Sequence, residues 1–156
     1  MNSLIPRVFI CSPYRAALTA EERKRLSAAE LIELRDQRLM ENVLIALAGC
    51  AFAHAHGKLP LAPHLYFTRF LEDDDPEERA EGIRLGSDWL MECEQVWVMN
   101  ETISEGMKAE IALAKSLGIP VQYFTSLDIC KETDASKYFL PIEEPSIQTT
   151  PGVAHA

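Results

Sequence analysis

The sequence predicts a single α/β domain in which a doubly wound, mainly parallel sheet is flanked by helices. Short runs of β-branched and aromatic residues alternate along the chain with longer segments of helical pattern, an order typical of parallel sheets. The length of 156 residues suits one domain and would be cramped for two. Apolar residues make up 47% of the chain and charged residues 25%, close to the averages of soluble globular proteins, so we expect an ordinary packed core.

The first strand and the start of the first helix have clear local signals. Residues 8–11 form a β-branched and aromatic run, and the turn-forming segment 12–15, Ser-Pro-Tyr-Arg, ends it. Thr19 followed three residues later by Glu22 has the pattern of a capping box, which predicts the start of a helix. Residues 21–40 favour helix throughout.

The helical pattern changes character in its second part. From Leu44 onwards apolar residues lie on all sides, which predicts that this part is buried. Gly57 is expected to end the helix. Residues 59–63 are apolar but contain two prolines, so they predict at best a brief or edge strand. Residues 64–70 are expected to form an aromatic and polar loop.

The second half of the chain repeats the alternation. The acidic run 72–75 before Pro76 is typical of a helix start, because acids are favoured at the positive end of the helix dipole. The expected elements are a helix over about 77–92, a strand at 95–99, a helix from Ser104 to about Leu117 that stops at Gly118, and a strand at 119–124.

These elements together predict a Rossmann-like or flavodoxin-like domain over residues 1–140. Residues 141–156 lack periodicity, so we expect a flexible tail or a segment that lies on a partner chain.

Composition excludes several functional classes. The net charge of -9 disfavours a nucleic-acid polymer as partner, although oriented N–H groups and an arginine could still hold a small anion. No apolar run is long enough to span a bilayer and residues 1–6 do not have the pattern of a secretory signal, so we expect a cytoplasmic protein without membrane contact. The cysteines have no metal-binding spacing, and reduced thiols are expected for all four, Cys11, Cys50, Cys93 and Cys130. We predict no cofactor and no metal.

A ligand site is expected where the strands end. In doubly wound sheets ligands bind beyond the carboxyl ends of the strands, so the loops after the first three strands should converge on one cleft. The candidate substrate-binding residues on these loops and on the helix that follows are Ser12, Tyr14, Arg15, His64, Tyr66, Ser104, Gly106 and Met107.

Two carboxylates are candidates for chemistry. Glu110 lies in the second turn of the helix that begins near Ser104, where its side chain could face the cleft. Gly106 near the start of this helix is unfavourable unless something approaches the backbone closely, and a ligand would explain it. Asp88 could supply the second carboxylate that glycosidic chemistry often needs. The alternative for both is a solvated helix carboxylate.

The other polar candidates also have structural alternatives. Ser12 and Arg15 could bind an anion together with backbone N–H groups, or segment 12–15 could be an ordinary turn. His64 could contact a ligand, or its ring could be satisfied by backbone groups. His54 and His56 have no matching carboxylates, so no metal site is proposed for them.

Several segments resemble the nucleoside 2-deoxyribosyltransferase-like family, and in particular its small phage and bacterial members, which are related to 2'-deoxynucleoside 5'-monophosphate N-hydrolases. The most specific is ISEGMKAEI at residues 103–111. The others are VFICSPYR at 8–15, LAPHLYF at 61–67, PEER at 76–79, CEQVWV at 93–98 and GIPV at 118–121. Residues 16–40 depart from the pattern and resemble an extension of the first helix.

The resemblance implies roles for particular residues. It makes Glu110 the nucleophile that attacks the anomeric carbon, forming a covalent glycosyl-enzyme, and Asp88 the residue that orients and helps to protonate the base. Family members that act on free nucleosides tend to have an aspartate six residues before the nucleophile, whereas the monophosphate hydrolases have a serine, as this chain does at Ser104. Together with Arg15, this favours a 5'-monophosphate substrate.

The expected function is therefore cleavage or transfer at the N-glycosidic bond of a (deoxy)nucleoside or its 5'-monophosphate through a glycosyl-Glu110 intermediate. The first alternative is a catalytically silent nucleotide-binding or sensing module, which would use the same cleft. The second is an interaction domain that binds a protein through its long helix and acidic face. Relatives assemble as homodimers or larger homo-oligomers, and the apolar helix around residues 43–55 could belong to such an interface.

Overall fold

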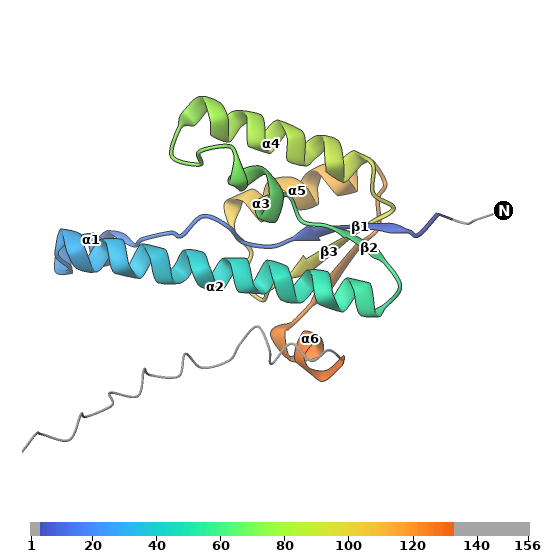
Figure 1. Cartoon of the computed structure of the whole chain (residues 1–156), viewed down its shortest axis with the longest axis horizontal. Helices are drawn as coiled ribbons and strands as arrows, with labels where there is room; N and C mark the ends of the chain where they lie inside the picture. Colours follow the sequence, from blue (N-terminus) through green and yellow to red (C-terminus); the bar gives the residue numbers. More distant parts are fainter. Residues whose placement is uncertain (1–3, 133–156) are drawn as a thin grey trace, which may run out of the picture.

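The computed structural model describes residues 4–132 and confirms the expected α/β architecture. Four strands form one parallel sheet in the order β2-β1-β3-β4, with helices on both faces (Figure 1). The strands are β1 (Arg7–Cys11), β2 (Leu59–Leu61), β3 (Gln95–Met99) and β4 (Val121–Phe124). Each lies within two residues of its expected position.

The register of the sheet makes β1 a central strand and β2 an edge strand. Phe9 pairs with Leu61 on one side and with Val96 on the other. Pro60 lies in β2, where a residue without a backbone N–H is tolerated because no other strand within residues 4–132 pairs with the outer side of β2. The expected edge strand is thus confirmed.

Alternation along the strands produces two hydrophobic cores, one on each face of the sheet. Ile10 and Met99 point toward α2 (Ala28–Ala55), which contributes Ala48, Phe52 and Ala53 to the first core. At Gly49 a Cβ atom would lie 2.8 Å from the Cγ atom of Met99, so this close packing of helix on sheet requires glycine.

The second core lies between the sheet and two helices, α4 (Pro76–Met91) and α5 (Glu105–Ser116). Phe9 and Cys11 of β1 pack there with Leu90 of α4 and with Met107 and Ile111 of α5. Both helices were expected at these positions.

The caps of these helices follow the sequence signals. Asp75 caps α4 by accepting hydrogen bonds from the backbone N–H groups of Glu77 and Glu78. Gly118, with a φ of 70°, follows the end of α5, and Gly57, with a φ of 69°, follows the end of α2.

The helix expected from residue 21 onwards is in fact two helices, α1 (Ala20–Arg25) and α2. Thr19 and Glu22 form the expected capping box, but Ser27 and Glu30 form a second one that starts α2 anew. Arg38 of α2 then bonds Glu22 of α1 through two contacts of 2.6 and 2.9 Å, which holds the two helices together.

Two short segments differ from the expected loops. We expected a loop at residues 64–70, but most of this segment belongs to α3 (Pro63–Tyr66) and to a 3-10 turn, η1 (Phe67–Arg69). Pro63 occupies the first turn of α3. Phe67 packs on Trp89 of α4 with ring centroids 4.6 Å apart. A further helix, α6 (Ser126–Glu132), was not expected. The expected tail at 141–156 lies outside the described residues. Within residues 4–132, no helix is both long and apolar enough to cross a membrane.

Candidate active site

A cleft of about 460 Å³ opens beyond the carboxyl ends of β1 and β2, between the loop after β1, α3, α4 and the start of α5. Its volume falls within the range of small-molecule sites. Most of the residues singled out from the sequence line it, namely Ser12, Tyr14, Arg15, His64, Ser104, Gly106, Met107 and Glu110.

Glu110 occupies an unusual environment for a carboxylate. Its side chain is only 22% exposed, and its Oε2 atom is buried without a hydrogen-bond partner among the described residues. Burial raises the pKa of Glu110 to about 7, while the neighbouring Cys11 thiol lowers that pKa by a smaller amount. A buried acceptor that the protein leaves unpaired costs stability and is typical of an atom that meets a ligand.

Among residues 4–132, His64 is the one basic side chain within 4.0 Å of the Glu110 carboxylate, with its Nε2 atom 4.0 Å from Oε1. Burial lowers the pKa of His64 to about 4, against the opposing effects of Asp73 and of a hydrogen bond to the Ser12 backbone. The imidazole is therefore neutral at pH 7. The ring of Tyr14 stacks on it with centroids 5.1 Å apart and planes 15° apart, which fixes its orientation.

An ionised Glu110 consequently has no fixed positive charge beside it. No lysine or arginine of residues 4–132 forms an ion pair with this carboxylate. The negative charge of an ionised Glu110 is therefore free to interact with a positive charge on a ligand.

Two side chains of α2 donate hydrogen bonds to the loop after β1. Asn42 donates a hydrogen bond of 2.9 Å to the Tyr14 carbonyl, and Arg38 donates one of 2.7 Å to the Ala17 carbonyl. Ser12, at the start of the loop, is 1% exposed and its Oγ atom has no partner among the described residues. The loop therefore presents a second unpaired polar atom in a residue that lines the cleft.

The start of α5 offers hydrogen-bond donors. Ser104 accepts the Met107 N–H at 3.3 Å, so its own hydroxyl proton remains available. The N–H groups of Glu105 and Gly106 have no acceptor within the helix, because they belong to its first turn. A Cβ atom at Gly106 would meet nothing closer than 3.9 Å, so space is open at this position. Helix N-termini of this kind bind anions.

Sequence reasoning missed an ionic network at the mouth of the cleft. Asp73 pairs with Arg79 of α4 at 2.6 Å and with Arg15 at 3.4 Å, so the carboxylate links two segments far apart in the sequence. Both Asp73 and Arg79 line the cleft. Two sequence signals could have pointed to Arg79: it lies in the PEER segment at 76–79 that carries the family resemblance, and it lies near the start of a helix, where the dipole disfavours a cation.

Two expected site residues lie outside the cleft. Asp88 is exposed, pairs with Arg84 one turn earlier on α4 at 2.9 Å, and does not line the cleft that contains Glu110. Its neighbour Ser87 lines the cleft instead, because each residue turns the helix by about 100°. Tyr66 is 55% exposed and stacks on Trp89 with ring centroids 5.4 Å apart.

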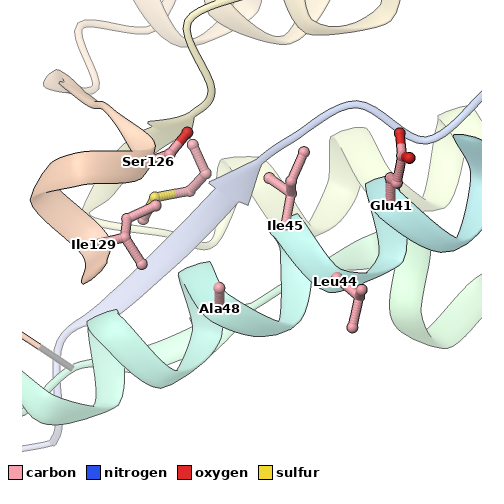
Figure 2. Close-up of a pocket in the computed structure, with 7 residues that line it drawn as sticks. Glu41, Leu44, Ile45, Ala48, Ser126 and Ile129 are labelled. Carbon is pink, nitrogen blue, oxygen red and sulfur yellow. The ribbon is translucent and has the colours of Figure 1, made fainter. Parts of the chain in front are cut away.

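A second, smaller cavity of about 220 Å³ lies on the opposite face of the sheet, between α2 and α6 (Figure 2). Its lining is mainly apolar and consists of Glu41, Leu44, Ile45, Ala48, Met99, Ser126 and Ile129. It contains no buried nucleophile like Glu110. Within residues 4–132, no three His, Cys, Asp or Glu side chains gather in a way that could hold a metal ion.

Comparisons with known proteins place the chain in a family. Residues 6–124 match the model of a family described as a domain of unknown function, DUF7768. A solved structure described as a 2-deoxyribosyltransferase from Bacillus psychrosaccharolyticus is similar at 19% identity and a TM-score of 0.44, over 81% of this chain and 81% of that one. No curated protein matches the sequence. By the extent of the family match, the chain belongs to the DUF7768 family.

Proposed function

We propose that the protein cleaves or exchanges the N-glycosidic bond of a nucleoside or nucleoside 5'-monophosphate, with Glu110 as the nucleophile. The observation that carries this proposal is the environment of Glu110. The carboxylate lines a cleft of ligand size, has an unpaired buried oxygen and has no fixed cation beside it. Such a group is complementary to a transient positive charge rather than to a protein side chain.

The reaction would proceed in two displacements. A Glu110 oxygen bonds to the anomeric carbon while the C–N bond breaks, and the base leaves with the bonding electrons and takes up a proton from solvent water. Water or a second base then attacks the same carbon and gives up a proton to solvent, and the ester bond to Glu110 breaks to restore the carboxylate. Both transition states resemble an oxocarbenium ion, which the charge of Glu110 stabilises.

The ionisation states of Glu110 and His64 suit the role of Glu110 as a nucleophile. With a pKa of about 7, Glu110 is ionised in a substantial fraction of molecules at neutral pH. The ionised form can then stabilise the positive charge that develops on the sugar in the transition state. His64 remains neutral, so it does not compete for the carboxylate as a cation. Its stacked ring can position Glu110 or the sugar by hydrogen bonding.

The start of α5 supports a phosphorylated substrate. The hydroxyl of Ser104 and the free N–H groups of Glu105 and Gly106 are suitable donors to a phosphate. Arg15, which pairs with Asp73 at 3.4 Å, could add a charge-assisted contact to the phosphate. A 5'-monophosphate is therefore the favoured substrate within the proposal.

The test is detection of free base by chromatography after incubation of the protein with each nucleoside and each 5'-monophosphate, with and without an acceptor base. The proposal predicts release by the parent protein and a loss of several orders of magnitude in Glu110→Ala and Glu110→Gln. Product formed only with acceptor would identify a transferase. Nucleotide binding without base release from any substrate would contradict the proposal and favour a silent binding module.

A further inference from the structure

Two glycines in the interior of α4, Gly82 and Gly86, line the cleft one turn apart. Glycine is less favourable than alanine in a helix interior, because it gains no side-chain packing and loses more backbone freedom on folding. Two glycines that line the cleft from the interior of one helix therefore need an explanation.

Packing within the protein does not supply that reason. A Cβ atom at Gly86 would lie 3.5 Å from Pro63, and one at Gly82 would lie 3.6 Å from Leu71, both ordinary contact distances. Neither glycine has a positive φ, so the backbone would accept alanine at either position. Pro63 and Leu71 themselves line the cleft, so the added methyl groups would stand at its wall.

An independent observation indicates that this cleft receives a ligand. Ser12 is 1% exposed, lines the cleft, and has an Oγ atom without a partner among the described residues. The Oε2 atom of Glu110 is likewise buried and unpaired. Gly82 and Gly86 therefore line a cleft that also contains buried polar atoms without hydrogen-bond partners.

We infer that the strip from Gly82 to Gly86 is the wall against which the base of the substrate lies flat, and that it selects purines over pyrimidines. This inference rests on the proposed function for the identity of the ligand. Four residues of helix span about 6 Å, which is longer than a single six-membered ring and suits a two-ring base. The apolar side chains of Phe67, Ile83 and Leu113 line the same cleft, and a purine buries more aromatic surface against them than a pyrimidine does.

The experiment measures the affinity of purine and pyrimidine nucleoside 5'-monophosphates by calorimetry, in a Glu110→Gln background that prevents turnover. Purine monophosphates are expected to bind about tenfold more tightly than pyrimidine ones. Adding Gly86→Ala or Gly82→Ala should weaken purine binding by about tenfold or more, because a methyl group overpacks the wall, and should change pyrimidine binding much less.

The controls separate this effect from damage to the fold. The alanine variants should melt at the same temperature or higher, since alanine favours helix, so a loss of affinity cannot come from unfolding. Arg84→Ala on the exposed side of α4 should leave both affinities unchanged, because Arg84 does not line the cleft.

Three results would overturn the inference: equal purine affinity with and without the methyl groups, an equal loss for purines and pyrimidines, or no binding of any nucleotide. Failure of the proposed function is separately visible. It appears as absence of base release by the parent protein, whereas the glycine effect is measured on binding alone.

Discussion

Replacing Glu110 with glutamine is expected to stabilise the protein at alkaline pH while it abolishes base release. Glutamine has nearly the shape of glutamate but no charge, so it removes the cost of holding an ionised carboxylate in the buried environment that raises the Glu110 pKa. A gain in stability from a substitution in the cleft would mark Glu110 as a group kept for function rather than for folding.

The sign and size of the effect follow from the pKa values. The folded protein binds the Glu110 proton more strongly than the unfolded chain, whose ordinary value is 4.5. The stability that this group contributes is therefore full below pH 4.5 and is lost as the pH rises through about 7. One pKa unit corresponds to about 1.4 kcal/mol, so the total loss is about 3 kcal/mol at most.

The assay is urea unfolding of the parent protein and of Glu110→Gln at several pH values between about 5 and 8. The difference in unfolding free energy between the two proteins should grow in favour of glutamine by about 2 to 3 kcal/mol across this range. His64 has the opposite dependence, because its lowered pKa contributes stability above pH 6.5 that is lost toward about pH 4. Because His64 lies 4.0 Å from Glu110, the difference includes the coupling of the two groups as well as the titration of Glu110.

A difference that does not change with pH would refute this reasoning, because Glu110 would then titrate in the folded protein as it does in the unfolded chain. A difference that changed in favour of glutamate would mean that a cation stabilises the carboxylate. Equal slopes of unfolding against urea in the two proteins are the check that the substitution has not altered the unfolded state.

Further outcomes are expected for the pH dependence and for two other residues. The kcat/KM of base release should rise about tenfold per pH unit below the Glu110 pKa of about 7 and level off above it, and a flat profile between pH 5 and 8 would contradict an ionised nucleophile. Ser104→Ala should cost about 1 kcal/mol of stability through the lost cap of α5, measured by urea unfolding, and should raise the KM for monophosphates more than for free nucleosides. If free nucleosides were affected equally, Ser104 would not contact the phosphate. Asp88→Asn should change kcat/KM less than about twofold, because Asp88 is exposed and paired with Arg84; a large loss would show that it reaches the substrate after all.

Local signals in the sequence were enough to predict most of the framework. Thr19 and Gly118 mark the start of α1 and the end of α5 through capping interactions that involve only neighbouring residues. The second start at Ser27 has the same kind of signal, but the helical pattern on both sides of it conceals the break. Pro63 marks the start of α3. The packing of Tyr66 of α3 and Phe67 of η1 on Trp89 supports this segment, and no local pattern contains those contacts.

The candidate site was predictable in outline because parallel strands bring the loops at their carboxyl ends to one edge of the sheet. Which side chains of a helix face the cleft depends on how the helix is rotated about its axis, and successive residues point about 100° apart. Ser87 therefore lines the cleft, whereas its neighbour Asp88 does not. The link between Arg15 and Asp73 required the tertiary structure, since the two residues belong to loops that meet only after folding.

The covalent intermediate tests the central claim most directly. The parent protein would be mixed with a deoxynucleoside 5'-monophosphate, quenched in acid, digested and analysed by mass spectrometry. The account predicts a mass increase equal to the deoxyribose phosphate residue on the peptide that contains Glu110, absent in Glu110→Gln. An adduct on a different residue, or base release that continues in Glu110→Gln, would contradict it.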